Sequence, residues 1–174
     1  AMGLKTKSNI GLATDLENRA IVICSIGDAA MTEGEVSEAL QMAALKQLPI
    51  IYLVQDNGWD ISATAEETRA MSAFEFAKGF VGIEALSIDG TDFTQCYDTM
   101  TYAIEKCRNE RRPFLIHAKV PLLNHHTSGV RMEWYRHDID LHKLDDPYFK
   151  IIKLMEDYGF SHNELNAILE ASKN

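Results

Sequence analysis

Two short apolar runs separated by a helical pattern constrain the fold of this chain more than any other feature. Residues 20–26 are rich in β-branched side chains and end at Gly27 and Asp28. Residues 50–54 form a similar run, which follows Pro49 and precedes a polar turn at 55–58. Continuous apolarity is typical of strands covered on both faces, as in parallel sheets. The pattern therefore predicts a right-handed β-α-β unit with parallel, neighbouring strands.

The segment between these runs has the pattern of an amphipathic helix. Thr32 precedes Glu35 by three residues, the spacing of a capping box at a helix start. An apolar stripe at helical spacing follows, made of Val36, Ala39, Leu40, Ala43 and Ala44. Such a stripe is suited to packing on one face of the sheet.

The alternation of strands and helices continues through residue 119. Further strands are expected at 85–89 and 113–119, and a helix at 72–80. Another helix is expected from residue 92 onward, capped by Thr91 or Asp92. Its predicted inner face consists of Phe93, Tyr97, Met100 or Thr101, Ile104 and Cys107. The fold class expected is α/β, with a mostly parallel sheet flanked by helices.

No repeat, linker or composition shift divides the chain, so residues 1–174 are expected to form a single domain. Within it, residues 121–146 are polar with scattered aromatics, and their length suggests a binding loop or lid. Residues 147–174 form a predicted helical tail, with a second capping-box spacing at Ser161 and Glu164. Gly159 marks the predicted stop of the first tail helix.

Composition excludes several classes of function. The formal net charge of −9 argues against a nucleic-acid-binding or anionic-membrane surface. No apolar run approaches the ~20 residues that a membrane-spanning helix needs, and no signal peptide is visible. The three cysteines, Cys24, Cys96 and Cys107, are far apart and lack metal-ligand spacing. They indicate reduced, mostly buried thiols in a cytoplasmic protein.

Polar residues follow both strands of the β-α-β unit. Asp28 comes after the first strand and Asn57 after the second, at the edge where open α/β sheets bind ligands. Carboxylate and amide oxygens suit magnesium, and the helix start near Thr32 directs backbone N–H groups that favour phosphate to the same edge. A magnesium-bridged diphosphate fits this arrangement. The alternative is that Asp28 and Asn57 only cap a helix and a turn.

Three blocks of sequence resemble a known family. Residues 27–35, Gly-Asp-Ala-Ala-Met-Thr-Glu-Gly-Glu, and 55–62, Gln-Asp-Asn-Gly-Trp-Asp-Ile-Ser, resemble the two ends of the thiamine diphosphate motif. In detail they are similar to the alpha subunits of the decarboxylase components of 2-oxo acid dehydrogenases. Residues 124–128, Asn-His-His-Thr-Ser, with 134–136, Trp-Tyr-Arg, resemble that family's histidine loop. Residues 145–147, Asp-Asp-Pro, resemble a third element.

This resemblance implies a partial thiamine diphosphate-binding fold and assigns roles to the first two blocks. It implies that Asp28 and Asn57 bind magnesium through side-chain oxygens and that Trp59 does so through its backbone carbonyl. It implies that Ala29 and Ala30 offer backbone amides to the diphosphate. All five residues would then contact the cofactor or its ion.

The resemblance also assigns residues close to the reacting part of the cofactor. Ile61 would lie near the cofactor rings. His126, in the mobile loop, would lie near the phosphates and the reacting carbon and is the catalytic candidate. From the residues alone, the alternative for His126 is a loop histidine that pairs with solvent or a carboxylate, and His125 beside it leaves the choice between the two open.

Three positions depart from the family pattern. Ala29 replaces a glycine, which narrows backbone freedom where the diphosphate approaches. Asp56 stands in place of an asparagine and adds negative charge, and Gln55 stands where some relatives carry an arginine. A substantial N-terminal portion of the family subunits is also absent, and the family's cofactor-activating glutamate lies on the beta partner. This piece alone is therefore expected to be inactive.

The reaction implied is oxidative decarboxylation of a 2-oxo acid, pyruvate or branched-chain, with acyl transfer to a lipoyl group. The implied partners are a beta subunit or beta domain and a lipoyl-bearing acyltransferase, in a homo-oligomer or heterotetramer. Two alternatives stay open at this stage. One is an acetoin-cleaving or transketolase-like thiamine diphosphate enzyme, and the other is a non-catalytic fragment or scaffold whose exposed apolar patches make it self-associate.

Overall fold

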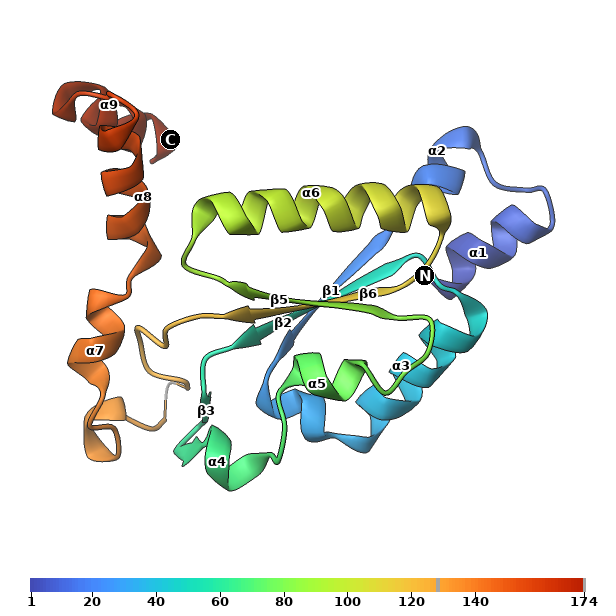
Figure 1. Ribbon diagram of the computed structural model, residues 1–174, viewed down its shortest axis with the longest axis horizontal. Helices are drawn as coiled ribbons and strands as arrows, with labels where there is room; N and C mark the ends of the chain where they lie inside the picture. The colour runs from blue at the N-terminus through green and yellow to red at the C-terminus, as the bar shows by residue number, and fades with distance from the viewer. Residues whose placement is uncertain (128, 174) are drawn as a thin grey trace.

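The fold is built on a four-stranded parallel sheet. The computed structural model describes residues 1–127 and 129–173, so Ser128 of the histidine loop and Asn174 lie outside the described residues. The strands run in the order β1-β2-β6-β5 (Figure 1). Their bounds are β1 Val22–Gly27, β2 Ile50–Asp56, β5 Glu84–Asp89 and β6 Phe114–Lys119. The predicted α/β class with a parallel sheet is confirmed.

Helices cover both faces of this sheet. In Figure 1, α3 (Gly34–Lys46) and α5 (Ala73–Ala77) lie on one side and α6 (Phe93–Glu110) on the other. A small antiparallel hairpin of β3 (Trp59–Asp60) and β4 (Ala63–Thr64) follows β2. The other elements are α1 (Met2–Asn9), α2 (Asp15–Arg19), η1 (Ala29–Thr32), α4 (Ala65–Thr68), η2 (Met132–Trp134), α7 (Ile139–Leu144), α8 (Pro147–Asp157) and α9 (His162–Ser172).

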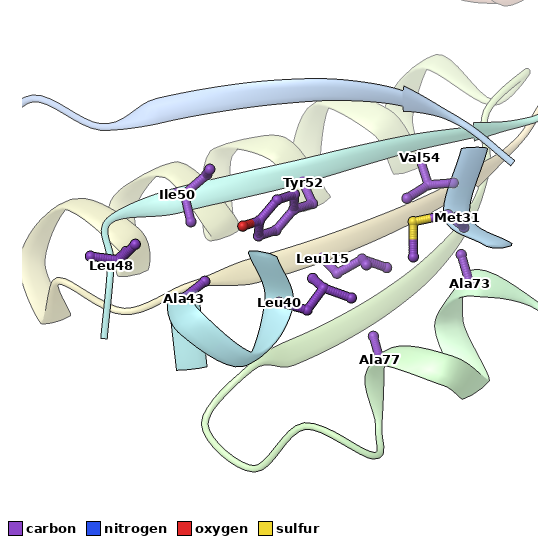
Figure 2. Packing of buried hydrophobic residues seen from close by; sticks show 10 residues of the cluster. All are labelled: Met31, Leu40, Ala43, Leu48, Ile50, Tyr52, Val54, Ala73, Ala77 and Leu115. Carbon is purple, nitrogen blue, oxygen red and sulfur yellow. The ribbon is translucent and has the colours of Figure 1, made fainter. Parts of the chain in front are cut away.

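The core has two layers because successive side chains of each central strand point to opposite faces. Tyr52 and Val54 of β2 pack with Leu40 of α3 and Leu115 of β6 in the first layer (Figure 2). On the opposite face, Ile51 belongs to a second layer. It packs there with Ile88, Ala103, Cys107, Phe114, Ile116 and Ala118. Strands β2 and β6 are therefore buried on both faces, as their continuous apolar runs predict.

The prediction that the first strand is covered on both faces was wrong. β1 lies at the edge of the described sheet, and its burial alternates, so Ile23 is 49% exposed. Val22, Cys24 and Ile26 pack against the first core layer instead. The run is apolar except for Ser25, but among the described residues helices cover only the face that carries Val22, Cys24 and Ile26.

Two helix predictions also need correction. The N-cap of α3 is Glu33, without a side-chain cap, because the Thr32 hydroxyl donates to the Ala29 carbonyl at 2.8 Å. In α6, Phe93 and Tyr97 were expected on the inner face but are mostly exposed. The inner face of α6 instead carries Cys96, Met100, Ala103, Ile104 and Cys107. The capping box predicted at Ser161 and Glu164 is confirmed at the start of α9.

The segment 121–146 contains more regular structure than its sequence indicates. It holds η2 and α7, and Thr127 forms an isolated antiparallel bridge with Val130. The tail helices α8 and α9 follow and stand to one side of the sheet (Figure 1). Within 1–127 and 129–173, no helix is both long enough and apolar enough to cross a membrane.

Candidate functional site

The two predicted ligand residues emerge on one edge of the sheet. β1 and β2 are parallel neighbours, and Gly27 lies opposite Gln55 in their register. Asp28 directly follows Gly27, and Asn57 follows Asp56, the last residue of β2. The sequence-based expectation that Asp28 and Asn57 share an edge is therefore confirmed.

Asp28 is a buried carboxylate at the start of η1. It is 2% exposed and accepts a hydrogen bond from Nη1 of Arg69 at 2.5 Å. Burial raises the pKa of Asp28, and the guanidinium only partly opposes this effect. Ala29 and Ala30 open η1, the turn whose first N–H groups have no partner within a helix. The carboxylate and these backbone groups thus occupy one corner of the sheet edge.

Asp56, one of the departures from the family pattern, is neutralised by its surroundings. Its Oδ1 atom accepts hydrogen bonds from Nη2 of Arg69 at 2.7 Å and from the Gly58 N–H at 3.0 Å. Its Oδ2 atom lies 2.7 Å from Nε2 of His117. Burial opposes ionisation, but these partners dominate and lower the pKa of Asp56 to about 2. The extra negative charge at this position is therefore compensated within the chain.

His117 connects this edge to the neighbouring strands. It lies on β6, is 1% exposed, and its Nδ1 atom is 3.1 Å from the Ser87 hydroxyl of β5. Because the Asp56 carboxylate only accepts, Nε2 donates to it, and in a neutral ring Nδ1 then accepts from Ser87. Neither of these polar partners of His117 was predicted from the sequence.

Arg69, which joins Asp28 to Asp56, was not predicted from the sequence. The available signal was weak: an arginine at the end of a short helix and a histidine inside an apolar strand. Both residue types need partners when they are buried. Which carboxylates pair with Arg69 and His117 is decided only in the folded chain, where the ends of β1 and β2, the strand β6 and the residue after α4 come together.

The turn after β2 places Asn57, Trp59 and Ile61. The Asn57 side-chain oxygen accepts the Trp59 backbone N–H at 2.9 Å, across Gly58 with its φ of +75°. This is the turn-capping role weighed as the alternative for Asn57, and the second lone pair of the oxygen is left for another contact. Ile61 lies between β3 and β4 with φ +52°, which is rare for a β-branched residue. Such strain is typical of functional sites.

The side chain of Trp59 connects the hairpin to segment 121–146. Its Nε1 atom donates to Oδ2 of Asp138 at 3.2 Å, and its ring lies 5.4 Å from that of Tyr135. The guanidinium of Arg136 lies 5.3 Å from the Trp59 ring and donates from Nε to Asp138 at 2.8 Å. The Trp-Tyr-Arg block that resembles the family loop therefore packs beside the site through Tyr135 and Arg136.

The catalytic candidate His126 lies on the surface of this segment. Its side chain is exposed, and within the described ranges no hydrogen bond or ion pair joins it to Asp28 or Asn57. The neighbouring His125 accepts the Met132 backbone N–H at its Nδ1 atom, 3.2 Å away. One ring nitrogen of His125 therefore helps to hold the loop.

A comparison with protein families decides where this chain belongs. The family model described as "Dehydrogenase E1 component" matches residues 3–173, nearly the whole chain. The chain belongs to this dehydrogenase E1 component family. The resemblance found at residues 27–35, 55–62 and 124–136 is thereby confirmed for this E1 chain.

Curated relatives agree with this family. The chain is 31% identical over 164 residues to the 3-methyl-2-oxobutanoate dehydrogenase subunit alpha of Mycobacterium tuberculosis, covering 91% of this chain and 44% of the relative. It is 26% identical over 151 residues to the pyruvate dehydrogenase E1 component subunit alpha of Rickettsia bellii, which covers 85% of this chain and 46% of the relative. This E1 chain thus spans less than half the length of these relatives.

A third relative is the 2-oxoisovalerate dehydrogenase subunit alpha 1 of Arabidopsis thaliana, a mitochondrial protein. This E1 chain is 26% identical to it over 168 residues, which are 94% of the chain and 36% of the relative. A solved structure assigned as a thiamin diphosphate-dependent enzyme from Mycobacterium smegmatis is 19% identical, with a TM-score of 0.48 over 68% of this chain and 20% of that chain.

Oxygen donors of the kind that magnesium prefers lie along this edge of the sheet. In the part of this E1 chain that the structure describes, no three His, Cys, Asp or Glu side chains form a group that could hold a metal. The oxygens that the resemblance assigns to the ion are the Asp28 carboxylate, the Asn57 amide oxygen and the Trp59 carbonyl, and the Asp56 carboxylate lies at the same edge. Magnesium commonly binds few protein ligands and completes its octahedron with phosphate oxygens and water. The residues present fit that requirement.

Proposed function

We propose that this chain anchors thiamine diphosphate through magnesium in the alpha part of a 2-oxo acid dehydrogenase. The observation that carries the proposal is the placement of Asp28 and Asn57 on one edge of two parallel strands. Asp28 supplies the one formal negative charge among the three proposed protein ligands. Asn57 supplies an amide oxygen and Trp59 its backbone carbonyl.

The residues around the proposed ion have distinct roles. Ala29 and Ala30 offer the first N–H groups of η1 to the diphosphate. Ile61, held in a left-handed conformation at the hairpin, would lie near the cofactor rings. When bound, thiamine diphosphate supplies the electron sink for loss of carbon dioxide from a 2-oxo acid. The protein's part is to hold the cofactor in place and to exclude water from the reacting carbon.

His126 is the proposed catalytic residue on segment 121–146. Its exposed ring is free to approach a bound substrate or cofactor if the segment moves over the sheet edge. The Trp59–Asp138 hydrogen bond keeps the later part of segment 121–146 beside that edge. His126 lies in the earlier part of the same segment. Protease sensitivity of 121–146 that does not change with cofactor in the intact protein would contradict this closure.

Substrates and partners follow from the names of the relatives and from the family resemblance. We propose a branched-chain 2-oxo acid or pyruvate as substrate, because alpha subunits of both dehydrogenases are among the relatives. Acyl transfer to lipoyl on an acyltransferase would follow decarboxylation. A beta subunit or domain would complete the active site in a heterotetramer or other oligomer, and residues 1–174 would contribute one domain. The three free thiols suit a reducing, cytoplasmic setting.

Calorimetry of cofactor binding tests the anchoring function. In the intact protein with its accompanying subunits, Asp28→Ala should abolish measurable binding of thiamine diphosphate with magnesium, because the ion loses its charged ligand. Asp140→Ala is the matched control, since the Asp140 side chain is 97% exposed on α7. Wild-type affinity in the Asp28→Ala protein would refute the proposed anchor, whereas loss in both variants would point to a general defect.

A further inference from the structure

One arginine bridges two carboxylates at the proposed cation site. Arg69 donates from Nη1 to Asp28 at 2.5 Å and from Nη2 to Asp56 at 2.7 Å. The three side chains are 11%, 3% and 12% exposed respectively. At these exposures the charges are poorly screened, so an unpaired carboxylate here would be costly. Arg69 therefore neutralises the same carboxylate that is proposed to bind the divalent ion.

The two carboxylates depend on Arg69 to different degrees. Asp56 has further partners in the Gly58 N–H and the ring of His117. Asp28 has the guanidinium as its ion-pair partner, and its backbone carbonyl is engaged separately by the Met31 N–H. Asp56 therefore holds the arginine in place. The charge balance of Asp28 depends mainly on the guanidinium, so Asp28 is the carboxylate more affected when that cation is exchanged.

The surroundings of Arg69 leave room for such a change. Arg69 is the C-cap residue of α4 and borders a cavity of about 290 Å³ that is also lined by Met31, Thr32 and Ser37. The side chain is therefore not enclosed by packing on all sides. The exchange requires only that Nη1 leave Asp28 while Nη2 keeps its contact with Asp56.

We propose that Arg69 is an internal counter-cation that occupies Asp28 and is displaced from it when the divalent ion binds. This inference rests on the proposed function of Asp28. Asp56 retains the guanidinium through its Nη2 contact, so the arginine is kept beside the site instead of being released to solvent. The exchange keeps Asp28 neutralised in both states. It also makes binding of the ion compete with an ion pair of the protein itself.

Manganese binding without any diphosphate measures this competition. Mn²⁺ replaces magnesium as probe, and the free ion is counted by electron paramagnetic resonance in the intact protein with its accompanying subunits. Arg69→Met should tighten Mn²⁺ binding about tenfold, since Asp28 then lacks a competing cation. Arg112→Met is the matched control, because Arg112 pairs with Glu84 and Glu110 away from this edge. Unchanged affinity in Arg69→Met would overturn the proposal.

A second variant distinguishes direct competition between Arg69 and the ion for Asp28 from a general electrostatic effect of the missing charge. Asp56→Asn weakens the hold of Asp56 on Arg69, so Asp28 keeps the guanidinium more tightly. We expect it to weaken Mn²⁺ binding several-fold in the wild-type background but to have little effect beside Arg69→Met. Equal effects in both backgrounds would indicate long-range charge alone and would overturn the proposal. Asp56→Asn keeps Arg69, so Mn²⁺ affinity that stays at the wild-type value in this single variant would overturn the proposal even if Arg69→Met fails to fold.

Asp28→Asn distinguishes failure of this inference from failure of the proposed function. If Asp28→Asn abolishes Mn²⁺ binding and Arg69→Met does not tighten it, Asp28 is the ligand but Arg69 does not compete. If Asp28→Asn leaves Mn²⁺ affinity at the wild-type value, the proposed anchor is wrong, and the role assigned to Arg69 is overturned with it.

Discussion

The indole of Trp59 donates a hydrogen bond from Nε1 to Oδ2 of Asp138 at 3.2 Å, although the two residues are 79 positions apart. Asp138 also accepts from Nε of Arg136 at 2.8 Å and pairs with Nε2 of His142 at 2.9 Å. Burial opposes its ionisation, but the Arg136 and Trp59 hydrogen bonds lower the pKa of Asp138. One carboxylate therefore fastens segment 121–146 to the hairpin that follows β2.

Removing this carboxylate should loosen the segment. Asp138→Ala leaves the buried guanidinium of Arg136 without its counter-charge and frees the Trp59 indole, so we expect a loss of about 1–3 kcal/mol in stability. Hydrogen–deuterium exchange of 121–146 should accelerate at least several-fold. Asp140→Ala, at an exposed position of the same segment, should leave exchange unchanged. Wild-type exchange rates in Asp138→Ala would contradict the fastening role.

Ile61 carries backbone strain that a glycine would relieve. Its φ of +52° is costly for a β-branched residue, and its side chain is 41% exposed, so little packing offsets that cost. Ile61→Gly should be more stable than Ile61→Ala by about 1 kcal/mol, because both lose the side chain and only glycine relieves the strain. Urea unfolding of the two variants measures the difference. Greater stability of the alanine variant would show that the turn is not strained.

Cys107 makes stability depend on pH in the alkaline range. The thiol is fully buried on α6, and burial raises its pKa to about 11. An unfolded thiol titrates near ~8.5, so the folded state holds the proton more tightly. The stabilising contribution is complete below the unfolded pKa and is lost as pH rises through about 11. The loss should amount to about 3 kcal/mol.

Unfolding by urea at pH 8 and at pH 11 tests this dependence. Cys107→Ala should lose less stability over that interval than the parent protein, because the titrating thiol is absent. Thr101→Ala, at an exposed position of the same helix, is the comparison and should retain the parent's dependence. Identical losses in Cys107→Ala and the parent would contradict the assignment to Cys107.

Sequence patterns predicted the sheet well where burial is complete. β2 and β6 are covered on both faces, so both faces of these strands require mainly apolar side chains. The continuous apolar runs at 50–54 and 114–118 show this requirement in the sequence. The inner face of α6 was predicted less well, because Phe93 and Tyr97 fit a helical stripe but are 51% and 62% exposed. Ala103 lies against the sheet instead, since its small side chain allows close approach of the backbone. Periodicity alone does not distinguish two adjacent stripes of one helix.

The candidate site was predictable only in part, for a related reason. Parallel strands end on one edge, so Asp28 and Asn57 could be placed together from their positions after two strands. The contacts among Arg69, Asp56 and His117 could not, because they depend on three elements meeting in the folded chain. Asp56 therefore looked like an uncompensated charge in the sequence, whereas the structure provides it with two basic partners.

The central claim is that Asp28 and Asn57 hold one divalent ion at the edge of the sheet. Anomalous diffraction from crystals of the intact protein with Mn²⁺ and thiamine diphosphate tests it most directly. The account predicts one manganese peak about 2.0–2.3 Å from an Asp28 carboxylate oxygen, the Asn57 amide oxygen and the Trp59 carbonyl, with diphosphate oxygens completing the shell. A manganese peak beside the diphosphate that contacts neither Asp28 nor Asn57 would contradict it.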